Sequence, residues 1–361
     1  MIFLLCFFLL FSSCASTPEP ATPDNGEAAD TQSSSENRDD PEGKEEETAD
    51  EFFHYGDLPE GTGKLSVLGF DEIWAYLRTG REGWALKLNY PISDLVYFAA
   101  EIDIYGKLVD VPNRRNLSKF PGRVHLSVIS NDRSRTHFIL EPGSALRKAL
   151  VADLLEAAKP YDGLNIDFEY IPGKDRDNFL SFLKELRDGL GNKMFTIAVQ
   201  ARSKTISDDI FNYEKITPLV DRVFVMAYDE HWSTSKPGSI ASLAWGRSVT
   251  NYALKTVGPE KLVMGLPFYG RAWGDINPAN AFSHSQIERI KKENAVTEVL
   301  RENGIPTFSY KAIVKVTAYY EDIHSINLRS SMYRDAGVKS IGFWALGQED
   351  TSVWNFFKLN R

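Results

Sequence analysis

The chain has 361 residues, of which 43% are apolar and 12% aromatic, so it can build a large core and is not globally disordered. The formal net charge of −9 is unevenly distributed: residues 15–50 carry 12 acidic and 2 basic side chains, whereas residues 51–361 carry 38 and 39. The body is therefore almost neutral, and its lack of a basic excess argues against nucleic acid as a partner.

The N-terminus has the features of an export signal. Residues 1–11 (MIFLLCFFLLF) form an uncharged apolar run, shorter than the ~20 residues that span a bilayer. Two serines and Cys14 follow, which resembles a bacterial lipoprotein signal. We therefore expect a signal peptide over 1–14, cleaved before Cys14, and a lipidated Cys14 that anchors an exported protein to a membrane, periplasmic or at the cell surface. A plain secretory signal or a short membrane anchor is the alternative.

The only cysteines are Cys6 and Cys14, so the body has neither a disulfide framework nor a cysteine-based zinc site. Residues 15–50 contain no Val, Ile, Leu, Met or aromatic residue. Such a segment cannot bury enough apolar surface to offset its ordering entropy, so we expect a disordered acidic linker. It is either a spacer between membrane and body or a solvated tail without a role.

The body, residues 51–361, alternates short apolar runs with amphipathic stretches. The helical patterns are clearest over Ser144–Ala158, Arg176–Leu190, Ser242–Val257 and Ser325–Ala336. Eight strands with intervening helices predict an α/β fold, a (β/α)8 TIM barrel, because eight parallel strands close into a barrel. The expected strands are Glu72–Leu77, Asp94–Ala99, Val124–Ser130, Gly163–Tyr170, Met194–Ala201, Arg222–Tyr228, Leu262–Phe268 and Ser340–Ala345.

The stretch from about 274 to 320 is too long for a simple connection after the seventh strand. It contains a helical pattern over Ser285–Asn303 and a strand pattern over Ala312–Tyr319. We therefore expect a small α+β insertion there.

The fourth expected strand is unusually polar for a barrel strand, which is normally buried on both faces. In Gly163–Tyr170, the residues Asn165, Asp167 and Glu169 alternate with apolar ones, so they share one face and approach the strand's C-terminal end. The apolar set would pack against the helices, which leaves the polar set inside the barrel. Barrel enzymes keep their catalytic residues at these strand ends, so two costly buried carboxylates here indicate an active site.

Two other interpretations of this strand fit the sequence less well. An exposed edge strand would show the same alternation, but large apolar neighbours and the helix that follows argue against it. A metal site built from Asp167 and Glu169 lacks a His or third carboxylate at a supporting spacing. We expect neither a metal nor a cofactor.

These residues resemble glycoside hydrolase family 18, the chitinase-like enzymes. Residues 162–169 (DGLNIDFE) are similar to its D-G-x-D-x-D-x-E signature, 226–229 (MAYD) to M-x-Y-D, 265–271 (GLPFYGR) to G-x-P-x-Y-G-R, and 342–344 (GFW) to the end of the eighth strand. The resemblance covers about residues 70–361 with its motifs in order. It implies the TIM barrel and a catalytic role for these strand ends.

The resemblance also implies roles for single residues. Glu169 would be the general acid and later the base, and Asp167 would orient the substrate's acetamido group and raise the pKa of Glu169. The two carboxylates lie two residues apart, ~6.6 Å between Cα atoms, and do not flank the bond. This arrangement suits substrate-assisted catalysis, in which the 2-acetamido oxygen attacks the anomeric carbon.

Other residues would bind the sugar. Tyr228 would donate its hydroxyl to the acetamido oxygen and Asp229 would bind the sugar or the acid. Trp344 would form the floor under the ring, with a core tryptophan as the alternative. Tyr269 and Arg271 would line the groove, although arginines at such positions are more often structural ion-pair partners.

The chain departs from typical chitinases at Asn165, where the family usually has Asp, and it lacks the S-x-G-G of the third strand. Asn165 can still hydrogen-bond Asp167 and would form part of the substrate site. The missing S-x-G-G disfavours a standard chitin groove. Asn165, together with residues 168–170 (FEY) and 175–179 (DRDNF), is closer to the bacterial spore-cortex and cell-wall branch, whose enzymes act on N-acetylglucosaminyl linkages of peptidoglycan and usually carry LysM repeats. No such repeat is present here, and a lipid anchor with a tether would serve the same purpose of holding the barrel near the cell wall.

We therefore expect a monomeric glycosidase of chitinase or N-acetylglucosaminidase type. It would cleave β-1,4 linkages of N-acetylglucosamine-containing glycans, peptidoglycan or chitooligosaccharide, with retention. The alternatives are a non-catalytic chitinase-like lectin, disfavoured because such proteins commonly lose the acid at the position of Glu169, and a structural surface lipoprotein.

Overall fold

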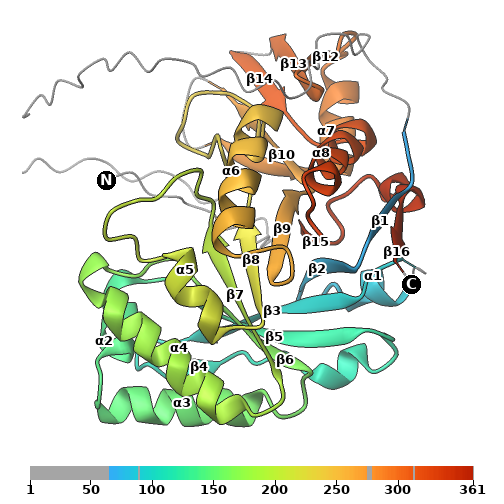
Figure 1. Cartoon of the computed structure of the whole chain (residues 1–361). Coiled ribbons are helices and arrows are strands. Elements are labelled where there is room, and N and C mark those ends of the chain that lie inside the picture. Colours follow the sequence, from blue (N-terminus) through green and yellow to red (C-terminus); the bar gives the residue numbers. More distant parts are fainter. Residues whose placement is uncertain (1–64, 88–89, 275–278, 312–313, 361) are drawn as a thin grey trace, which may run out of the picture. The chain divides into compact units, whose positions relative to one another are not determined.

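The computed structural model describes residues 65–87, 90–274, 279–311 and 314–360, so the expected signal peptide, Cys14 and the acidic linker lie outside the described residues. Eight parallel strands form one closed barrel, because β2 pairs with β15 on one side and with β3 on the other (Figure 1). The predicted TIM barrel is therefore confirmed. Its strands in spatial order are β2 (Glu72–Arg78), β15 (Ser340–Trp344), β9 (Leu262–Pro267), β8 (Arg222–Met226), β7 (Met194–Gln200), β6 (Gly163–Phe168), β5 (Arg123–Ser130) and β3 (Asp94–Ile102).

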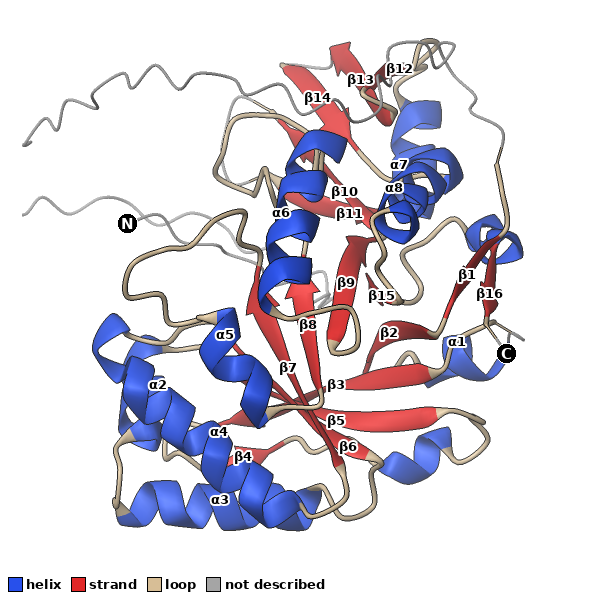
Figure 2. Cartoon of the chain, in the orientation of Figure 1, coloured by secondary structure: helices blue, strands red, loops and turns tan. Residues whose placement is uncertain are grey.

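Helices and 3-10 turns connect these strands, and all four helices expected from the sequence are present (Figure 2). The helices are α1 (Glu82–Lys87), α2 (Arg133–Leu140), α3 (Ala145–Ala157), α4 (Arg176–Leu190), α5 (Tyr213–Ile216), α6 (Leu243–Thr256), α7 (His284–Glu293) and α8 (Ile323–Asp335). The 3-10 turns are Arg114–Leu117, Gly173–Asp175, Thr217–Leu219 and Thr351–Phe356. Two short pairings complete the body, β4 (Leu108–Val109) against β3 and β1 (Leu68–Phe70) against β16 (Phe357–Leu359).

The barrel strands separate two apolar cores. An outer core lies between the strands and the helices, and β6 contributes Leu164, Ile166 and Phe168 to it. Phe168 packs there against Phe182 of α4, with ring centroids 5.9 Å apart. The inner core fills the barrel with large side chains, namely Trp74, Tyr76, Val96, Phe98, Ile129, Phe224, Val263 and Ala345.

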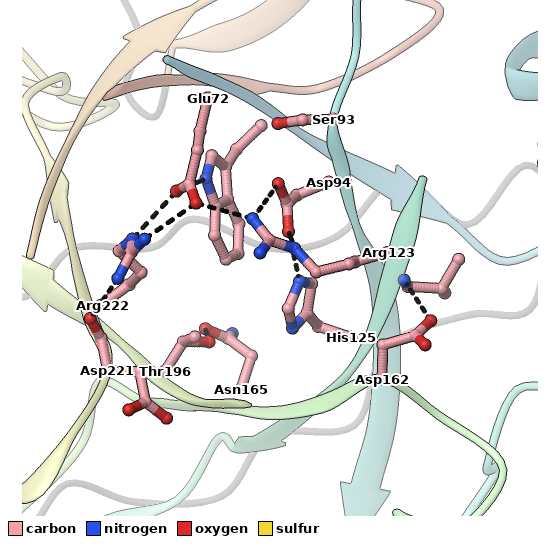
Figure 3. Close-up of polar contacts among 12 residues, drawn as sticks. Glu72, Ser93, Asp94, Arg123, His125, Asp162, Asn165, Thr196, Asp221 and Arg222 are labelled. Carbon is pink, nitrogen blue, oxygen red and sulfur yellow. Dashed lines mark hydrogen bonds and ion pairs between the residues drawn. The ribbon is translucent and has the colours of Figure 1, made fainter. Parts of the chain in front are cut away.

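Ion pairs close the barrel at the N-terminal ends of its strands (Figure 3). Glu72, which begins β2, accepts hydrogen bonds from Arg123 at 2.6 Å and from Arg222 at 2.8 Å. Asp94, which begins β3, accepts from Arg123 at 2.6 Å and lies 2.7 Å from Nε2 of His125. Because these carboxylates are fully engaged with cations, we interpret the cluster as structural, at the end of the barrel opposite to Glu169.

The insertion after the seventh barrel strand is present and forms a separate antiparallel sheet. Its strands in spatial order are β11 (Asn280–Ser283), β10 (Tyr269–Trp273), β14 (Lys315–Tyr319), β13 (Ile305–Lys311) and β12 (Leu300–Glu302), with α7 following β11. The sheet thus begins at Tyr269, directly after β9, earlier than the boundary of 274 expected from the sequence.

The helix expected over Ser285–Asn303 was wrong in its C-terminal part. The helix ends at Glu293, and Ala295 next adopts a positive φ of 47°. Asn303 and Gly304, with φ of 50° and 82°, then form the two-residue turn between β12 and β13. Asn-Gly is the preferred sequence for such a hairpin turn, and this signal competes with the helical periodicity before it. The expected strand over Ala312–Tyr319 is confirmed as β14 from Lys315, while 312 and 313 lie outside the described residues.

Candidate active site

The three polar residues of the fourth barrel strand, β6, lie on one side of it. Asn165 and Asp167 are buried within β6, and Glu169 follows its last residue, at the C-terminal end of the barrel. The intervening Leu164, Ile166 and Phe168 belong to the outer core. The alternation therefore directs the polar side chains towards the interior of the barrel, as the sequence predicted.

Burial dominates the electrostatics of the two carboxylates. Asp167 is 6% exposed, and its Oδ1 accepts no hydrogen bond from any described residue. Burial raises the pKa of Asp167 well above its ordinary value. Burial also raises the pKa of Glu169, and the negative charges of Asp167 and then Asp229 raise it further. Glu169 therefore keeps its proton towards neutral pH and can act as an acid.

Asn165 lies deeper than the carboxylates, in a hydrogen-bond network that its amide completes. Its Nδ2 donates to the hydroxyls of Ser127 at 3.2 Å and Tyr76 at 3.3 Å, and its Oδ1 accepts from Thr196 at 2.9 Å. The side chain is 1% exposed, and Figure 3 shows it beside Thr196. Both N–H donors are thus used away from Asp167, which corrects the expected Asn165–Asp167 hydrogen bond. A substrate contact of Asn165 stays a prediction.

Tyr228 follows β8 and belongs to the same electrostatic environment. Burial raises its pKa well above the ordinary value, and nearby Tyr76, Asp167, Glu169 and Asp229 add to the effect. The phenol therefore stays protonated and can donate a hydrogen bond. Its ring meets that of Tyr269 edge to face, with centroids 6.4 Å apart.

Asp229 and Arg271 form a buried ion pair in which Arg271 Nη2 lies 2.9 Å from Asp229 Oδ1. Arg271 also lies over the ring of Tyr269, with 5.4 Å between Cζ and the centroid. Arg271 therefore forms the structural ion pair that was the alternative expectation for it. Direct sugar binding by Asp229, Tyr269 or Arg271 stays a prediction.

Trp344 ends β15 and contributes to an aromatic wall. Its ring lies 4.8 Å from that of Phe98, edge to face, and 5.2 Å from that of Tyr76. The side chain is partly exposed and also packs against the inner core, so a sugar-binding role for Trp344 stays a prediction. The insertion packs against this aromatic wall, because a cluster of Tyr269, Trp273 and Tyr319 contacts both Tyr228 and Trp344.

Tyr76 is a residue of this site that the sequence did not reveal. It is 1% exposed, accepts the hydrogen bond from Asn165, and contacts Trp344. Burial and then the charge of Asp167 raise its pKa, which places it close to the carboxylates. The only signal in the sequence is an inward position on an otherwise apolar strand, which any core tyrosine would share.

Two aromatic side chains lie in the loop after β8, close in sequence to Asp229. His231 Nδ1 lies 2.8 Å from the carbonyl of Ser239, and Trp232 donates to Thr234 at 2.9 Å, so both side chains interact within their own loop. Across the described ranges, no group of three or more His, Cys, Asp or Glu side chains is placed to hold a metal ion. In the same ranges, no helix is long and apolar enough to cross a bilayer.

Comparison with known proteins agrees with this geometry. Similar curated proteins include the Uncharacterized glycosylase YvbX of Bacillus subtilis (strain 168), 30% identical over 58% of this chain and 64% of YvbX. The Cortical fragment-lytic enzyme of the same organism is 25% identical over 71% of this chain and 65% of that protein. The chain thus spans just under two thirds of the length of these relatives.

Solved structures share the fold. The Bacillus cereus spore cortex-lytic enzyme SleL superposes with a TM-score of 0.73 at 21% identity, covering 86% of this chain and 79% of that one. The family model for Glycosyl hydrolases family 18 matches residues 120–349, a range that contains Asn165, Asp167, Glu169, Tyr228 and Trp344. Because this match covers more than half of the sequence, the chain belongs to glycosyl hydrolase family 18.

Proposed function

We propose that the chain hydrolyses β-1,4 linkages next to N-acetylglucosamine, with retention of anomeric configuration. The observation that carries the proposal is the juxtaposition, at the C-terminal end of β6, of the buried Asp167 with Glu169, whose pKa is raised by burial and by Asp167. A carboxyl group that keeps its proton near neutral pH is what protonation of a leaving sugar oxygen requires.

The proposed reaction uses the substrate as its own nucleophile. Glu169 gives its proton to the glycosidic oxygen while the acetamido oxygen of the substrate attacks the anomeric carbon. Asp167 accepts the acetamido N–H through Oδ1, which accepts no bond from any described residue, and Tyr228 donates to the acetamido oxygen. Glu169 then removes a proton from water, which attacks the anomeric carbon from the side of the departed sugar and restores the configuration.

The names of the relatives point to cell-wall glycans. Two similar proteins are described as cortical fragment-lytic and spore cortex-lytic enzymes, which favours peptidoglycan fragments over chitooligosaccharides as the substrate. We propose further that the protein is exported and held at a membrane through Cys14, on the strength of its N-terminal sequence. Replacement of Cys14 by Ser should abolish incorporation of a labelled fatty acid.

Glu169→Gln tests the hydrolase proposal. The variant keeps the size of the side chain but cannot donate the proton, so we expect turnover of chitotetraose and muropeptides to fall by about 100-fold or more. Glu293→Gln on the exposed end of α7 is the matched control and should keep wild-type turnover. Wild-type turnover in Glu169→Gln would refute the assignment, and glycan binding without turnover in the native protein would favour the lectin.

A further inference from the structure

Two arginines that have no counter-ion among the described residues lie at the mouth of the barrel, where β2 ends. Arg78 is the last residue of β2, and the backbone N–H of Arg81 donates to the Arg78 carbonyl at 3.1 Å. Neither side chain makes an ion pair with any residue in the described part of the chain, and Nε of Arg78 is buried without a hydrogen-bond partner. A partly buried guanidinium without a partner is costly and calls for an anion.

The direction of Arg78 follows from the alternation of β2. Trp74 and Tyr76 belong to the inner core of the barrel, so Arg78 is the next residue on the inward face. In the strand register it pairs with Phe98, whose ring lies 4.8 Å from that of Trp344. Arg78 therefore stands one layer above Tyr76, next to the aromatic wall of the active site.

Neighbouring acids do not neutralise this pair. The nearest carboxylate in sequence, Glu82, accepts hydrogen bonds from the Tyr97 hydroxyl and from the N–H of Gly80, at 3.0 Å. Burial and the positive charge of Arg81 lower the pKa of Arg78, and no acidic group contributes to its shift. Arg78 therefore carries its charge without a counter-ion among the described residues, although the body as a whole is almost neutral.

We propose that Arg78, assisted by Arg81, binds a carboxylate carried by the sugar adjoining the N-acetylglucosamine at the active site. The substrate class is then an acidic amino-sugar polymer in which alternate sugars bear a lactyl ether with a free carboxylate, as in peptidoglycan strands from which the stem peptides have been removed, and not a neutral polymer. This inference rests on the proposed function for the placement of the glycan. A planar guanidinium matches a carboxylate in bidentate geometry, which a neutral sugar cannot supply.

The test measures binding in the Glu169→Gln background by calorimetry. The two ligands are a β-1,4 tetrasaccharide with free lactyl carboxylates and the same molecule with those carboxyl groups amidated. We expect the free acid to bind about tenfold or more tightly than the amide, with the preference falling as salt is added. Adding Arg78→Gln should remove the preference, and Arg78→Lys should retain part of it.

A matched control separates recognition from general effects of charge. Arg289 is exposed on α7, so Arg289→Gln in the same background should keep the preference. An unchanged preference in a folded Arg78→Gln protein, shown by its circular dichroism spectrum, would overturn the inference. So would equal binding of both ligands before Arg78 is replaced.

Turnover by the protein with Glu169 intact distinguishes this inference from the proposed function. A carboxylate preference that depends on Arg78, without cleavage of either ligand, would refute hydrolysis and leave the Arg78 assignment standing. Cleavage of both ligands, with a ratio of their kcat/KM values that Arg78→Gln does not alter, would support hydrolysis and refute the Arg78 assignment. Failure to bind either ligand would overturn both.

Discussion

Arg271 donates two hydrogen bonds, 3.1 Å long from Nε and 2.9 Å long from Nη2, to the same carboxylate oxygen of Asp229. Both side chains are only 4% exposed. The pair joins β10 of the insertion to the loop after β8, where Asp229 adopts a positive φ of 58°. The charge of Asp229 also raises the pKa of Glu169. The insertion therefore helps to hold a charge that acts on the proposed acid.

Replacing Arg271 by Gln should strongly destabilise the protein. The substitution leaves Asp229 charged and buried without its cation, which in other proteins costs about 3–5 kcal/mol. Urea denaturation at neutral pH measures the change, with Arg289→Gln as an exposed control that should leave the free energy of unfolding unchanged. Equal stability of the two variants would mean that the Asp229–Arg271 pair contributes little.

Asp167→Asn should reduce the dependence of stability on pH. Burial holds the folded pKa values of Asp167 and Glu169 above their ordinary values of 3.8 and 4.5. The folded state then binds more protons than the unfolded state, so stability falls as pH rises from the ordinary values through the raised ones. Asp167→Asn removes one such group and its repulsion of Glu169, so the loss of stability between pH 5 and pH 8 should shrink.

The same variant should alter activity in a second way. Without the charge of Asp167, the pKa of Glu169 is lower, so the alkaline limb of kcat/KM should move to lower pH, on top of a reduced maximum rate. Asp188→Asn on the exposed end of α4 is the control. An alkaline limb in the same place as in the native protein would show that Asp167 does not set the pKa of Glu169.

The barrel was predictable because its strands are separated by clear breaks, and the position of Asp167 and Glu169 was predictable because strand alternation assigns faces. The residues of other strands that surround these carboxylates were not predictable. Tyr76 and Phe98 lie in apolar strands where an aromatic residue at the site has the same pattern as one in the core. Contacts between distant strands depend on barrel closure, which local periodicity does not encode.

The hydrogen-bond network around Asn165 was also not predictable from the sequence. It predicts the effect of replacing Asn165 by Asp, the usual residue of the family. Asn165→Asp replaces the two N–H donors to Tyr76 and Ser127 by a carboxylate that is buried close to Asp167. We expect a loss of about 1–3 kcal/mol at neutral pH, shrinking as pH falls and the new carboxyl group takes up a proton. Urea denaturation at pH 5 and pH 8 measures it. A variant as stable as the native protein at pH 8 would contradict the network.

Gly342, in the motif before Trp344, should tolerate no side chain. A Cβ at this position would lie 2.2 Å from Cε2 of Phe224 and 3.1 Å from Cβ of Trp74, inside the barrel. Both rings belong to the inner core that supports Tyr76, so they cannot move freely. Gly342→Ala should therefore lower the free energy of unfolding by about 1–3 kcal/mol through overpacking.

Gly173 provides the matched control for this substitution, because a Cβ added there meets no atom within 4 Å and its φ is ordinary. Gly173→Ala should leave stability unchanged or raise it slightly by restricting the unfolded chain. The ring of Phe224 packs edge to face against that of Tyr76, with centroids 5.0 Å apart. Gly342→Ala should therefore also raise KM by displacing Tyr76 and the aromatic wall of the active site. Loss of stability with native KM would show that the inner core and the substrate wall are independent; native stability would show that the barrel interior accommodates the methyl group.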